Sequence, residues 1–347
     1  MKKYAQPDTI KTGVIGYGPG SNMGKLHLEH MRCAGLSPIC VVEPDPERRK
    51  TAGTEFPEIE LYESVEKMLA NSDVNLLAVI TPHNTHYAIA RQCLQAGKHV
   101  ICEKPMTLTT EECDDLIEEA GQHGLLVTAY HNRHWNGDIL QAVQKVKHDH
   151  AIGDIVRIEL HPRVCYSVND SWRCNRKLSG GIAYDWGVHL LEAALQLVDG
   201  DLLEVSGYAH NGFRSTQTKW GKDVVEDDFQ LTARFGNGVW VMLTASNIDC
   251  LPKRNERGLM EITGTQGTFV SDPTGWKIFK LVKDKIVSEN GPNLPDRWQC
   301  FYDEIRGFMV EGKPLTITPE WARRPVHILD LALRSIEAGR TLPAKYK

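Results

Sequence analysis

One stretch decides how the N-terminal part of this chain folds: Thr12-Gly13-Val14-Ile15-Gly16-Tyr17-Gly18-Pro19-Gly20-Ser21-Asn22-Met23-Gly24. Residues 13–16 are typical of a short strand, and a helical stretch begins at Lys25. Glycines at such a turn let the backbone approach a pyrophosphate at the helix N-terminus, where free N–H groups attract anions. Gly18 and Gly24 are farther apart than in the G-x-G-x-x-G fingerprint, so the loop must bulge or Gly20 must take the third role. The alternative is an ordinary glycine-rich turn. We predict a dinucleotide-binding turn made of Gly16, Gly18, Gly20, Asn22, Met23 and Gly24.

An acidic residue follows this turn at the expected distance. Glu43 lies 19 residues after Gly24 (43 − 24), at the end of the second predicted strand. A carboxylate there accepts hydrogen bonds from ribose hydroxyls and repels a 2′-phosphate, so NAD is favoured over NADP. Arg48 and Arg49 leave NADP open, because a nearby arginine can accommodate that phosphate. Their position in the first turns of a helix, however, predicts that they face solvent.

The N-terminal part alternates short β-branched runs with stretches of helical period, which is typical of a parallel sheet with crossover helices. Gly97 and Gly124 stand where helices would end before a strand. The pattern predicts a doubly wound α/β Rossmann sheet over residues 1–132. Its expected strands are residues 13–16, 39–43, 76–80, 99–103 and 125–130.

After a helix expected at residues 135–148, strands follow one another directly. Glycine-containing turns at residues 236–238 and 264–267 favour hairpins. We therefore predict an α+β domain over residues 133–347, with a large, mostly antiparallel open sheet and a final helix at about residues 319–339. One face of such a sheet often stays free of helices and can serve as a subunit interface. The strands are expected at residues 155–160, 203–209, 228–235, 239–246, 258–262 and 268–271.

The composition limits the class of partner. The chain has 347 residues, of which 41% are hydrophobic and 24% charged, and its net charge of -5 argues against nucleic-acid binding. No apolar run is long enough for a bilayer span, and the start lacks the apolar segment of a secretory signal. Nine scattered cysteines without C-x-x-C spacing indicate reduced thiols. We expect a cytoplasmic protein with small-molecule partners and no membrane association.

The first catalytic candidate is Lys104, which follows Cys102-Glu103 at the end of a predicted strand and precedes Pro105. Ligands of open α/β sheets gather beyond the carboxyl ends of the strands. Pro105 biases Lys104 toward an extended backbone, which would direct its side chain away from the strand end. A lysine there can hydrogen-bond a substrate hydroxyl, whereas a lone lysine is more often a solvated surface charge.

The second candidate is the pair Asp185 and His189. The two residues are spaced i and i+4 on a predicted helix whose apolar stripe lies on another face, so both can reach one ligand, or the aspartate can orient the imidazole. Histidine suits the proton transfer that accompanies alcohol oxidation near neutral pH. The alternative is a helix N-terminal acid together with a histidine satisfied within the structure.

Together these motifs resemble those of the Gfo/Idh/MocA family, the group of glucose-fructose oxidoreductase and inositol dehydrogenase. The resemblance spans residues 12–189, and the predicted sheet and tail helix extend it to nearly the whole chain. Its motifs are Gly16-Tyr17-Gly18 with His27, Thr81-Pro82-His83-Asn84-Thr85-His86, the run from Ala96 to Pro105, and Asp185-Trp186-Gly187-Val188-His189.

The resemblance implies an NAD-dependent dehydrogenase of a sugar, glycoside or cyclitol. It implies His189 as acid/base, Lys104 as hydroxyl ligand, and Asp185 as substrate ligand or orienter. It also places the loop containing Thr81, Pro82, His83 and His86 over the cofactor, with Glu103 beside it, and implies a homodimer or homotetramer. Pocket walls that would hold sugar hydroxyls are expected from Asn132, Arg133, Trp172 and Arg173, although interdomain packing and a structural ion pair are equally open for the last two.

Three further possibilities are weighed. His83 and His86 could suggest a metal, but no third ligand at metal spacing stands out, so no metal is expected. An NAD-assisted glycoside-cleaving enzyme would oxidise a sugar transiently and retain its nucleotide. A nucleotide-binding sensor without turnover would not need Lys104, Asp185 and His189 together.

Overall fold

The computed structural model describes residues 4–18, 22–161, 168–249, 259–272 and 274–346. Contacts divide the chain into two compact units, which are described separately. Unit 1 comprises Met1–His131 and Gln299–Arg323, and unit 2 comprises Asn132–Trp298 and Arg324–Lys347. Gly20 lies outside the described residues. The functional boundary expected at residues 132 and 133 stays a prediction.

Unit 1 is built on a six-stranded parallel sheet in the order β3-β2-β1-β4-β5-β6. The strand order reverses between β1 and β4, so the loops after these strands flank the switch point at which open α/β sheets bind ligands. The predicted Rossmann sheet is confirmed. Its strands are β1 (Lys11–Ile15), β2 (Ser37–Val42), β3 (Glu60–Tyr62), β4 (Leu76–Val79), β5 (His99–Cys102) and β6 (Val127–Ala129).

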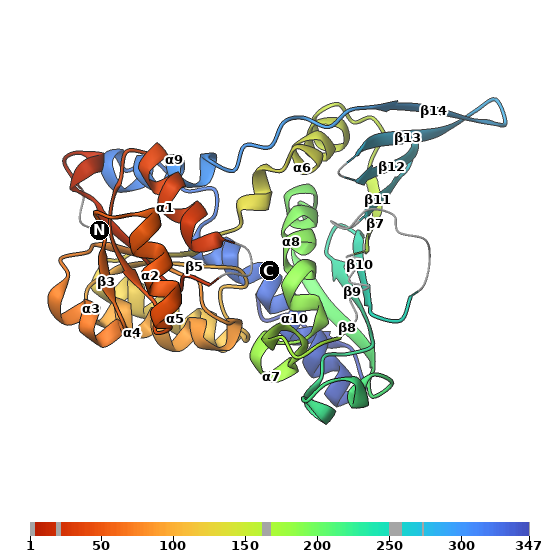
Figure 1. Cartoon of the computed structure of the whole chain (residues 1–347). Helices are drawn as coiled ribbons and strands as arrows, with labels where there is room; N and C mark the ends of the chain where they lie inside the picture. The colour runs from red at the N-terminus through yellow and green to blue at the C-terminus, as the bar shows by residue number, and fades with distance from the viewer. Residues whose placement is uncertain (1–3, 19–21, 162–167, 250–258, 273, 347) are drawn as a thin grey trace. The chain divides into compact units, whose positions relative to one another are not determined.

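Helices cover this sheet, and β4 and β5 are consequently buried at every residue. Gly97 and Gly124 follow α4 and α5 with positive φ angles of 76° and 63°, as the sequence predicted for helix ends. The helices of unit 1, seen around the sheet in Figure 1, are α1 (Met23–Cys33), α2 (Pro46–Glu55), α3 (Val65–Asn71), α4 (His86–Gln95), α5 (Thr110–His123) and α9 (Cys300–Arg306).

Unit 2 contains a nine-stranded sheet in the order β14-β13-β12-β11-β7-β10-β9-β8-β15. Among the strands that the structure describes, only the β7–β10 pair is parallel, which confirms the mostly antiparallel sheet. The strands are β7 (Ile155–His161), β8 (Leu202–His210), β9 (Asp228–Phe235), β10 (Trp240–Ser246), β11 (Leu259–Gly264), β12 (Gly267–Asp272), β13 (Gly275–Val282), β14 (Lys285–Gly291) and β15 (Leu342–Pro343).

In the described part of unit 2, helices lie along one face of this sheet (Figure 1). Gly207 on β8 packs so closely on α10 that a Cβ there would meet the Ala332 carbonyl oxygen at 2.3 Å. The helix expected at residues 135–148 begins later and ends as a π-helical segment, η4 (Val143–His148). The helices are α6 (Gly137–Ala142), α7 (Arg176–Ser179), α8 (Ile182–Leu197) and α10 (Pro319–Ala338), which begins in unit 1.

Candidate functional site

The glycine turn of unit 1 joins β1 to α1. Gly16 has a φ of 102°, and a Cβ there would lie 2.7 Å from the Ile80 carbonyl oxygen. Gly24, in the first turn of α1, packs so closely on the strand end that a Cβ would meet the Gly16 carbonyl oxygen at 3.1 Å. Gly24 therefore provides the close helix–strand approach that the third fingerprint glycine provides.

The N-terminus of α1 is open among the described residues. Asn22, its N-cap residue, has a φ of 51° and makes no side-chain cap hydrogen bond, and Met23 is the first helical residue. The first N–H groups of a helix lack intrahelical acceptors, so an uncapped terminus beside a glycine turn suits an anion.

Glu43 follows β2 and is 4% exposed. Its Oε2 accepts a hydrogen bond from the backbone N–H of Tyr17 at 2.7 Å, and its Oε1 accepts one from Asp45 at 3.0 Å. The carboxylate thus holds the glycine turn against the loop after β2. Tyr17 could not be identified from the sequence as the partner of Glu43, because 26 residues separate the two.

The two arginines after Glu43 differ in their surroundings. Arg49 donates to the carbonyl oxygens of Glu43 and Pro44. Arg48 is exposed, and its Nη1 lies 3.7 Å from the position that a Cβ on Gly18 would take. The Arg48 guanidinium therefore lies beside the glycine turn.

The loop after β4 carries Thr81, Pro82, His83 and His86. His86 is fully buried, with Nδ1 2.8 Å from the Pro105 carbonyl oxygen and Nε2 2.9 Å from that of Thr81. Burial lowers the pKa of His86, and the two carbonyl oxygens act in the opposite direction. His86 joins the loop after β4 to the loop after β5, which holds Lys104. His83, in the 3₁₀ turn η2 (His83–Thr85), is 4% exposed.

Lys104 leaves the carboxyl end of β5 and is half-buried, and a cis peptide bond joins it to Pro105. Its backbone N–H donates to Glu103 Oε2 at 3.0 Å. Burial raises the pKa of Glu103, but its hydrogen bond with His27 and the charge of Lys104 outweigh burial and hold that pKa below its usual value. An anionic carboxylate therefore lies directly beside Lys104.

In unit 2, α8 carries Asp185 and His189, and its first turn is fixed from outside. Gly181 has a φ of 119°, and a Cβ there would lie 2.8 Å from Glu226 Oε2. That oxygen accepts the N–H of Ile182, the first helical residue, at 2.9 Å. Glu226 precedes β9, is 2% exposed, and was not foreseen from the sequence.

Asp185 is half-buried beside a cavity of about 110 Å³. Its Oδ2 is 3.7 Å from Arg173 Nε, and the Arg173 guanidinium lies 4.6 Å from the Trp172 ring centre. The cavity walls also include Ser171 and Asn247, which the sequence did not single out. The cavity is thus lined by hydroxyl, amide, guanidinium and carboxylate groups.

A second cluster of α8 contacts the turn η3 (Asn132–Trp135). The guanidinium of Arg133 lies 4.6 Å from the Trp186 ring and 5.6 Å from the Trp298 ring. One turn past His189, the buried Glu192 is 2.6 Å from His134 Nδ1. His189 itself is 7% exposed and packs edge-on against Trp186, and Asn132 is 6% exposed.

Comparison with known proteins decides the family. A model described as an oxidoreductase family with an NAD-binding Rossmann fold matches residues 10–131, and the GFO/IDH/MocA C-terminal domain matches residues 140–270. This chain belongs to the Gfo/Idh/MocA family. It is therefore an NAD(P)-binding oxidoreductase, and dehydrogenases are among its relatives.

Several relatives span this Gfo/Idh/MocA protein almost completely. The chain is 26% identical to scyllo-inositol 2-dehydrogenase (NADP⁺) IolW of Bacillus subtilis, over 99% of this chain and 98% of that one. A solved structure of the Bacillus subtilis oxidoreductase YvaA matches with a TM-score of 0.83 and 25% identity, covering 99% and 100% of the two chains. Levoglucosan dehydrogenase in complex with NADH and levoglucosan matches with a TM-score of 0.81 over 97% and 99%; at 19% identity this likeness shows the fold alone.

The predicted site residues of this Gfo/Idh/MocA chain fall into two groups. The glycine turn, Glu43, the loop after β4, Glu103 and Lys104 gather at the carboxyl edge of the parallel sheet in unit 1. Asp185, His189, Arg173, Trp172, Arg133 and Asn132 belong to unit 2 and surround α8. Their roles stay predictions.

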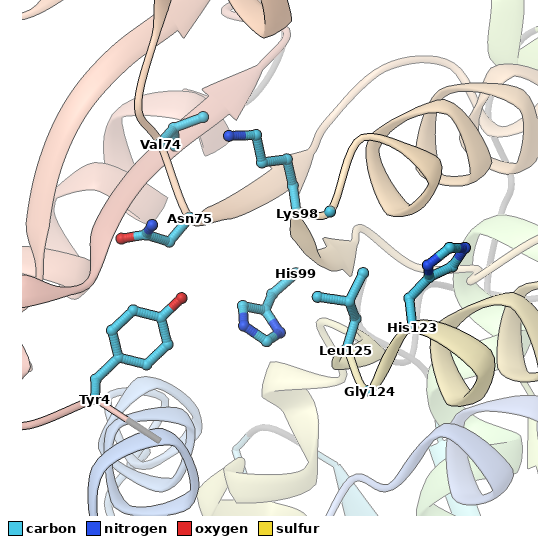
Figure 2. Close-up of a pocket in the computed structure, with 9 residues that line it drawn as sticks. Tyr4, Val74, Asn75, Lys98, His99, His123, Gly124 and Leu125 are labelled. Atoms are coloured by element: carbon cyan, nitrogen blue, oxygen red, sulfur yellow. The ribbon is translucent and has the colours of Figure 1, made fainter. Parts of the chain in front are cut away.

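A larger cavity, of about 450 Å³, lies at the opposite edge of the unit 1 sheet (Figure 2). It is lined by Tyr4, Asn75, Lys98, His99 and His123. His99 Nδ1 accepts the Leu126 N–H at 2.9 Å, and Asn75 Oδ1 accepts the Lys11 N–H at 2.8 Å. These polar groups hold the strand starts together, and none of the predicted site residues lines the cavity.

Among the residues that the structure describes, no three His, Cys, Asp or Glu side chains gather as metal ligands would. In the same part of the chain, no helix combines the length and apolar character that a membrane span requires.

Proposed function

We propose that this protein catalyses reversible hydride transfer between a secondary hydroxyl of a sugar, glycoside or cyclitol and the nicotinamide of NAD. The observation that carries the proposal is the face of α8, where Asp185 borders a cavity that also holds the side chains of Ser171, Arg173 and Asn247, and His189 follows one turn later. Family membership as an oxidoreductase supports it, as does the activity named for its relative scyllo-inositol 2-dehydrogenase.

The glycine turn fits a dinucleotide, because Gly16 and Gly24 allow the turn to pack closely against Ile80 and Tyr17, where Cβ atoms would collide, and because the α1 N-terminus is uncapped. We assign the pyrophosphate to Gly16, Gly18, Gly20, Asn22, Met23 and Gly24 and the adenosine ribose to Glu43. The loop with Thr81, Pro82, His83 and His86, and Glu103 beyond it, would border the nicotinamide. When bound, NAD supplies the hydride acceptor. NAD is preferred because the buried Glu43 carboxylate would repel a 2′-phosphate.

The chain's own residues then handle the proton. As the carbon–hydrogen bond breaks and its electron pair leaves as hydride, the hydroxyl proton passes to His189, leaving a carbonyl. Lys104 donates a hydrogen bond to the reacting oxygen, and Glu103 beside it supplies negative charge. Asp185 orients the substrate or the His189 imidazole.

Substrate hydroxyls would be held by groups that the cavity offers. Arg173 and Asp185 line the cavity and oppose one another in charge, and the Trp172 ring, which is outside the cavity lining, contacts the Arg173 guanidinium and would add an aromatic face. Asn132 and Arg133 from η3 would hold further hydroxyls. Hydrogen-bond donors and acceptors beside aromatic faces suit a polyhydroxylated ring.

The test uses purified protein with NAD⁺ or NADP⁺ and a panel of inositols, monosaccharides and glycosides. The formation of NADH or NADPH is followed by absorbance. Lys104→Ala and His189→Ala are expected to lower kcat/KM by about hundredfold or more, because each removes a group that acts on the reacting oxygen. Lys98→Ala is the matched control, since Lys98 lies just before β5 and Lys104 just after it.

Full turnover in both variants would overturn the site assignment. Release of sugar from a glycoside without net NADH, by protein that retains its nucleotide, would instead establish the glycoside-cleaving alternative. Tight nucleotide binding without turnover of any substrate would favour a sensor.

A further inference from the structure

In unit 1, a series of buried polar side chains joined by hydrogen bonds ends at Glu103. None of the roles proposed above uses the other side chains of this series. His27 on α1 and Tyr302 on α9 are both fully buried. His27 Nε2 lies 3.2 Å from Glu103 Oε1, and its Nδ1 is hydrogen-bonded to the Tyr302 hydroxyl. Buried polar groups are costly unless paired, so this chain of three side chains is an ordered element of the fold.

The Glu103 carboxylate fixes the direction of one of these hydrogen bonds, and the Tyr302 phenol is an available donor for the other. Glu103 is held ionised and can only accept, so His27 Nε2 carries the proton and donates to it. Burial raises the pKa of Tyr302 well above its usual value, so the phenol keeps its proton and can donate to His27 Nδ1. With Tyr302 as donor, the hydrogen bonds run from the Tyr302 hydroxyl through His27 to the Glu103 carboxylate.

The other oxygen of Glu103 accepts the backbone N–H of Lys104 at 3.0 Å. The Glu103 carboxylate thus accepts a hydrogen bond from the His27 imidazole at one oxygen and from the Lys104 backbone at the other. Lys104 is the residue that we assign to the reacting oxygen. Tyr130 is a direct neighbour of His27 but lies outside this hydrogen-bonded series. The Tyr130 ring centre is 4.2 Å from the His27 ring centre, whereas the Tyr130 hydroxyl is 3.3 Å from His30 Nδ1.

We infer that His27 is a positioning residue: supported by Tyr302, it fixes the Glu103 carboxylate and, through it, the backbone from which the Lys104 side chain extends. This inference rests on the proposed function of Lys104. His27 touches neither substrate nor cofactor in this assignment. It acts on hydride transfer only through Glu103 and Lys104.

The kinetic test compares His27→Leu, His27→Gln, Tyr302→Phe and the matched control Tyr130→Phe. His27→Leu is expected to lower kcat by about ten- to hundredfold, as small displacements of a reacting group do, and to change the Kd of NAD⁺ by less than about threefold. His27→Gln restores kcat to within about threefold of wild type, because its amide N–H can donate to Glu103. Tyr302→Phe is expected to lower kcat by a few fold. Tyr130→Phe also removes a phenolic hydroxyl, but one that is not hydrogen-bonded to His27, and should leave kcat unchanged.

A second arm needs no substrate. ¹⁵N-histidine NMR, with the His27 signals identified by their loss in His27→Gln, is expected to show Nε2 protonated and Nδ1 unprotonated. A proton on Nδ1 overturns the donor order, and unchanged kcat in His27→Leu, or an equal loss in Tyr130→Phe, overturns the positioning role. Tyr302→Phe and His27→Gln keep the test open if His27→Leu does not fold. If wild-type protein turns over no substrate, the proposed function fails, while the NMR arm still decides the hydrogen-bond chain.

Discussion

At the scale of the residue, the structural role of Glu43 can be set beside the part in cofactor choice that we propose for it. Its two oxygens accept the backbone N–H groups of Tyr17 and Asp45, so the charge is buried and held in one position. A fixed anion at the end of β2 would discriminate against a 2′-phosphate more strongly than a mobile one, because it has no freedom to turn away.

We expect Glu43→Gln to reduce the preference for NAD⁺ over NADP⁺, measured as the ratio of kcat/KM, by about tenfold, equivalent to ~1.4 kcal/mol. The amide keeps an acceptor for the Tyr17 N–H but removes the charge that repels the phosphate. Glu47→Gln, in the exposed first turn of α2, is the matched control and should leave the ratio unchanged. A wild-type protein that prefers NADP⁺, or an unaltered ratio in Glu43→Gln, would contradict the NAD assignment.

Sequence spacing could predict some site residues and not others. Glu43 was accessible because a strand–turn–helix unit fixes the distance from the glycines, and Lys104 because strand ends of a parallel sheet gather at one edge. Tyr302 lies 275 residues from His27, and Glu226 lies 44 residues from Ile182. No local periodicity relates such pairs, because the path of the intervening chain brings them together.

At the scale of the element, α8 depends on Glu226 for its first turn. The carboxylate accepts the Ile182 N–H and fills the space beside Gly181, where a side chain would collide with it. Burial is the main cause that raises the pKa of Glu226, so the charged form is costly, although Arg176 at 3.9 Å lowers that cost. The orientation of Asp185, three residues into α8, therefore depends on a buried acid.

We expect Glu226→Ala to lower the free energy of unfolding by about 1–3 kcal/mol, because the buried Ile182 N–H loses its acceptor. Glu226→Gln keeps an acceptor and should stay within about 1 kcal/mol of wild type at low pH. The pKa of Glu226 is higher in the folded protein than in the unfolded chain. The protonated side chain therefore contributes its full stabilisation at pH values below the unfolded-state pKa, and this stabilisation is lost as the pH rises through the folded-state pKa. Glu226→Gln should thus gain on wild type in urea unfolding as the pH rises from about 4.5 through the raised folded-state pKa of Glu226.

Glu289→Gln in β14, which removes an exposed carboxylate of unit 2, is the control and should show no such trend. A difference between Glu226→Gln and wild type that stays constant with pH would refute the pKa argument.

Two of the strands that the sequence analysis did not predict lack a buried pattern. β14 is exposed at nearly every residue, and β3 has only three residues, none of them buried, so neither shows the alternation that marks a strand. β4 and β5 were predicted because their continuous apolar runs reflect burial on both faces. The helix at residues 135–148 showed the right period, but a π-helical segment cannot be distinguished from an α-helix by so short a pattern.

At the scale of the whole molecule, the open face of the unit 2 sheet is mixed in character. On β10, Val241 and Leu243 are buried toward the helices, whereas Trp240 and Met242 point to the other face. Trp240 is 37% exposed, and its neighbours across the sheet are Arg157 on β7 and Arg234 on β9. An aromatic residue between arginines is a composition favoured at the centre of protein interfaces.

We propose that a second copy of this chain covers that face, giving a homodimer or homotetramer, and we expect light scattering after size-exclusion chromatography to give at least twice the mass of one chain. Trp240→Lys is expected to lower that mass toward the monomer, because it adds a third cation beside Arg157 and Arg234 on a surface that would meet its own copy. Leu61→Lys on β3, where the leucine is 38% exposed, makes the same change at matched exposure in unit 1 and should keep the wild-type mass. A monomeric wild-type protein at micromolar concentration, or a Trp240→Lys variant with unchanged mass, would show that this face is not the interface.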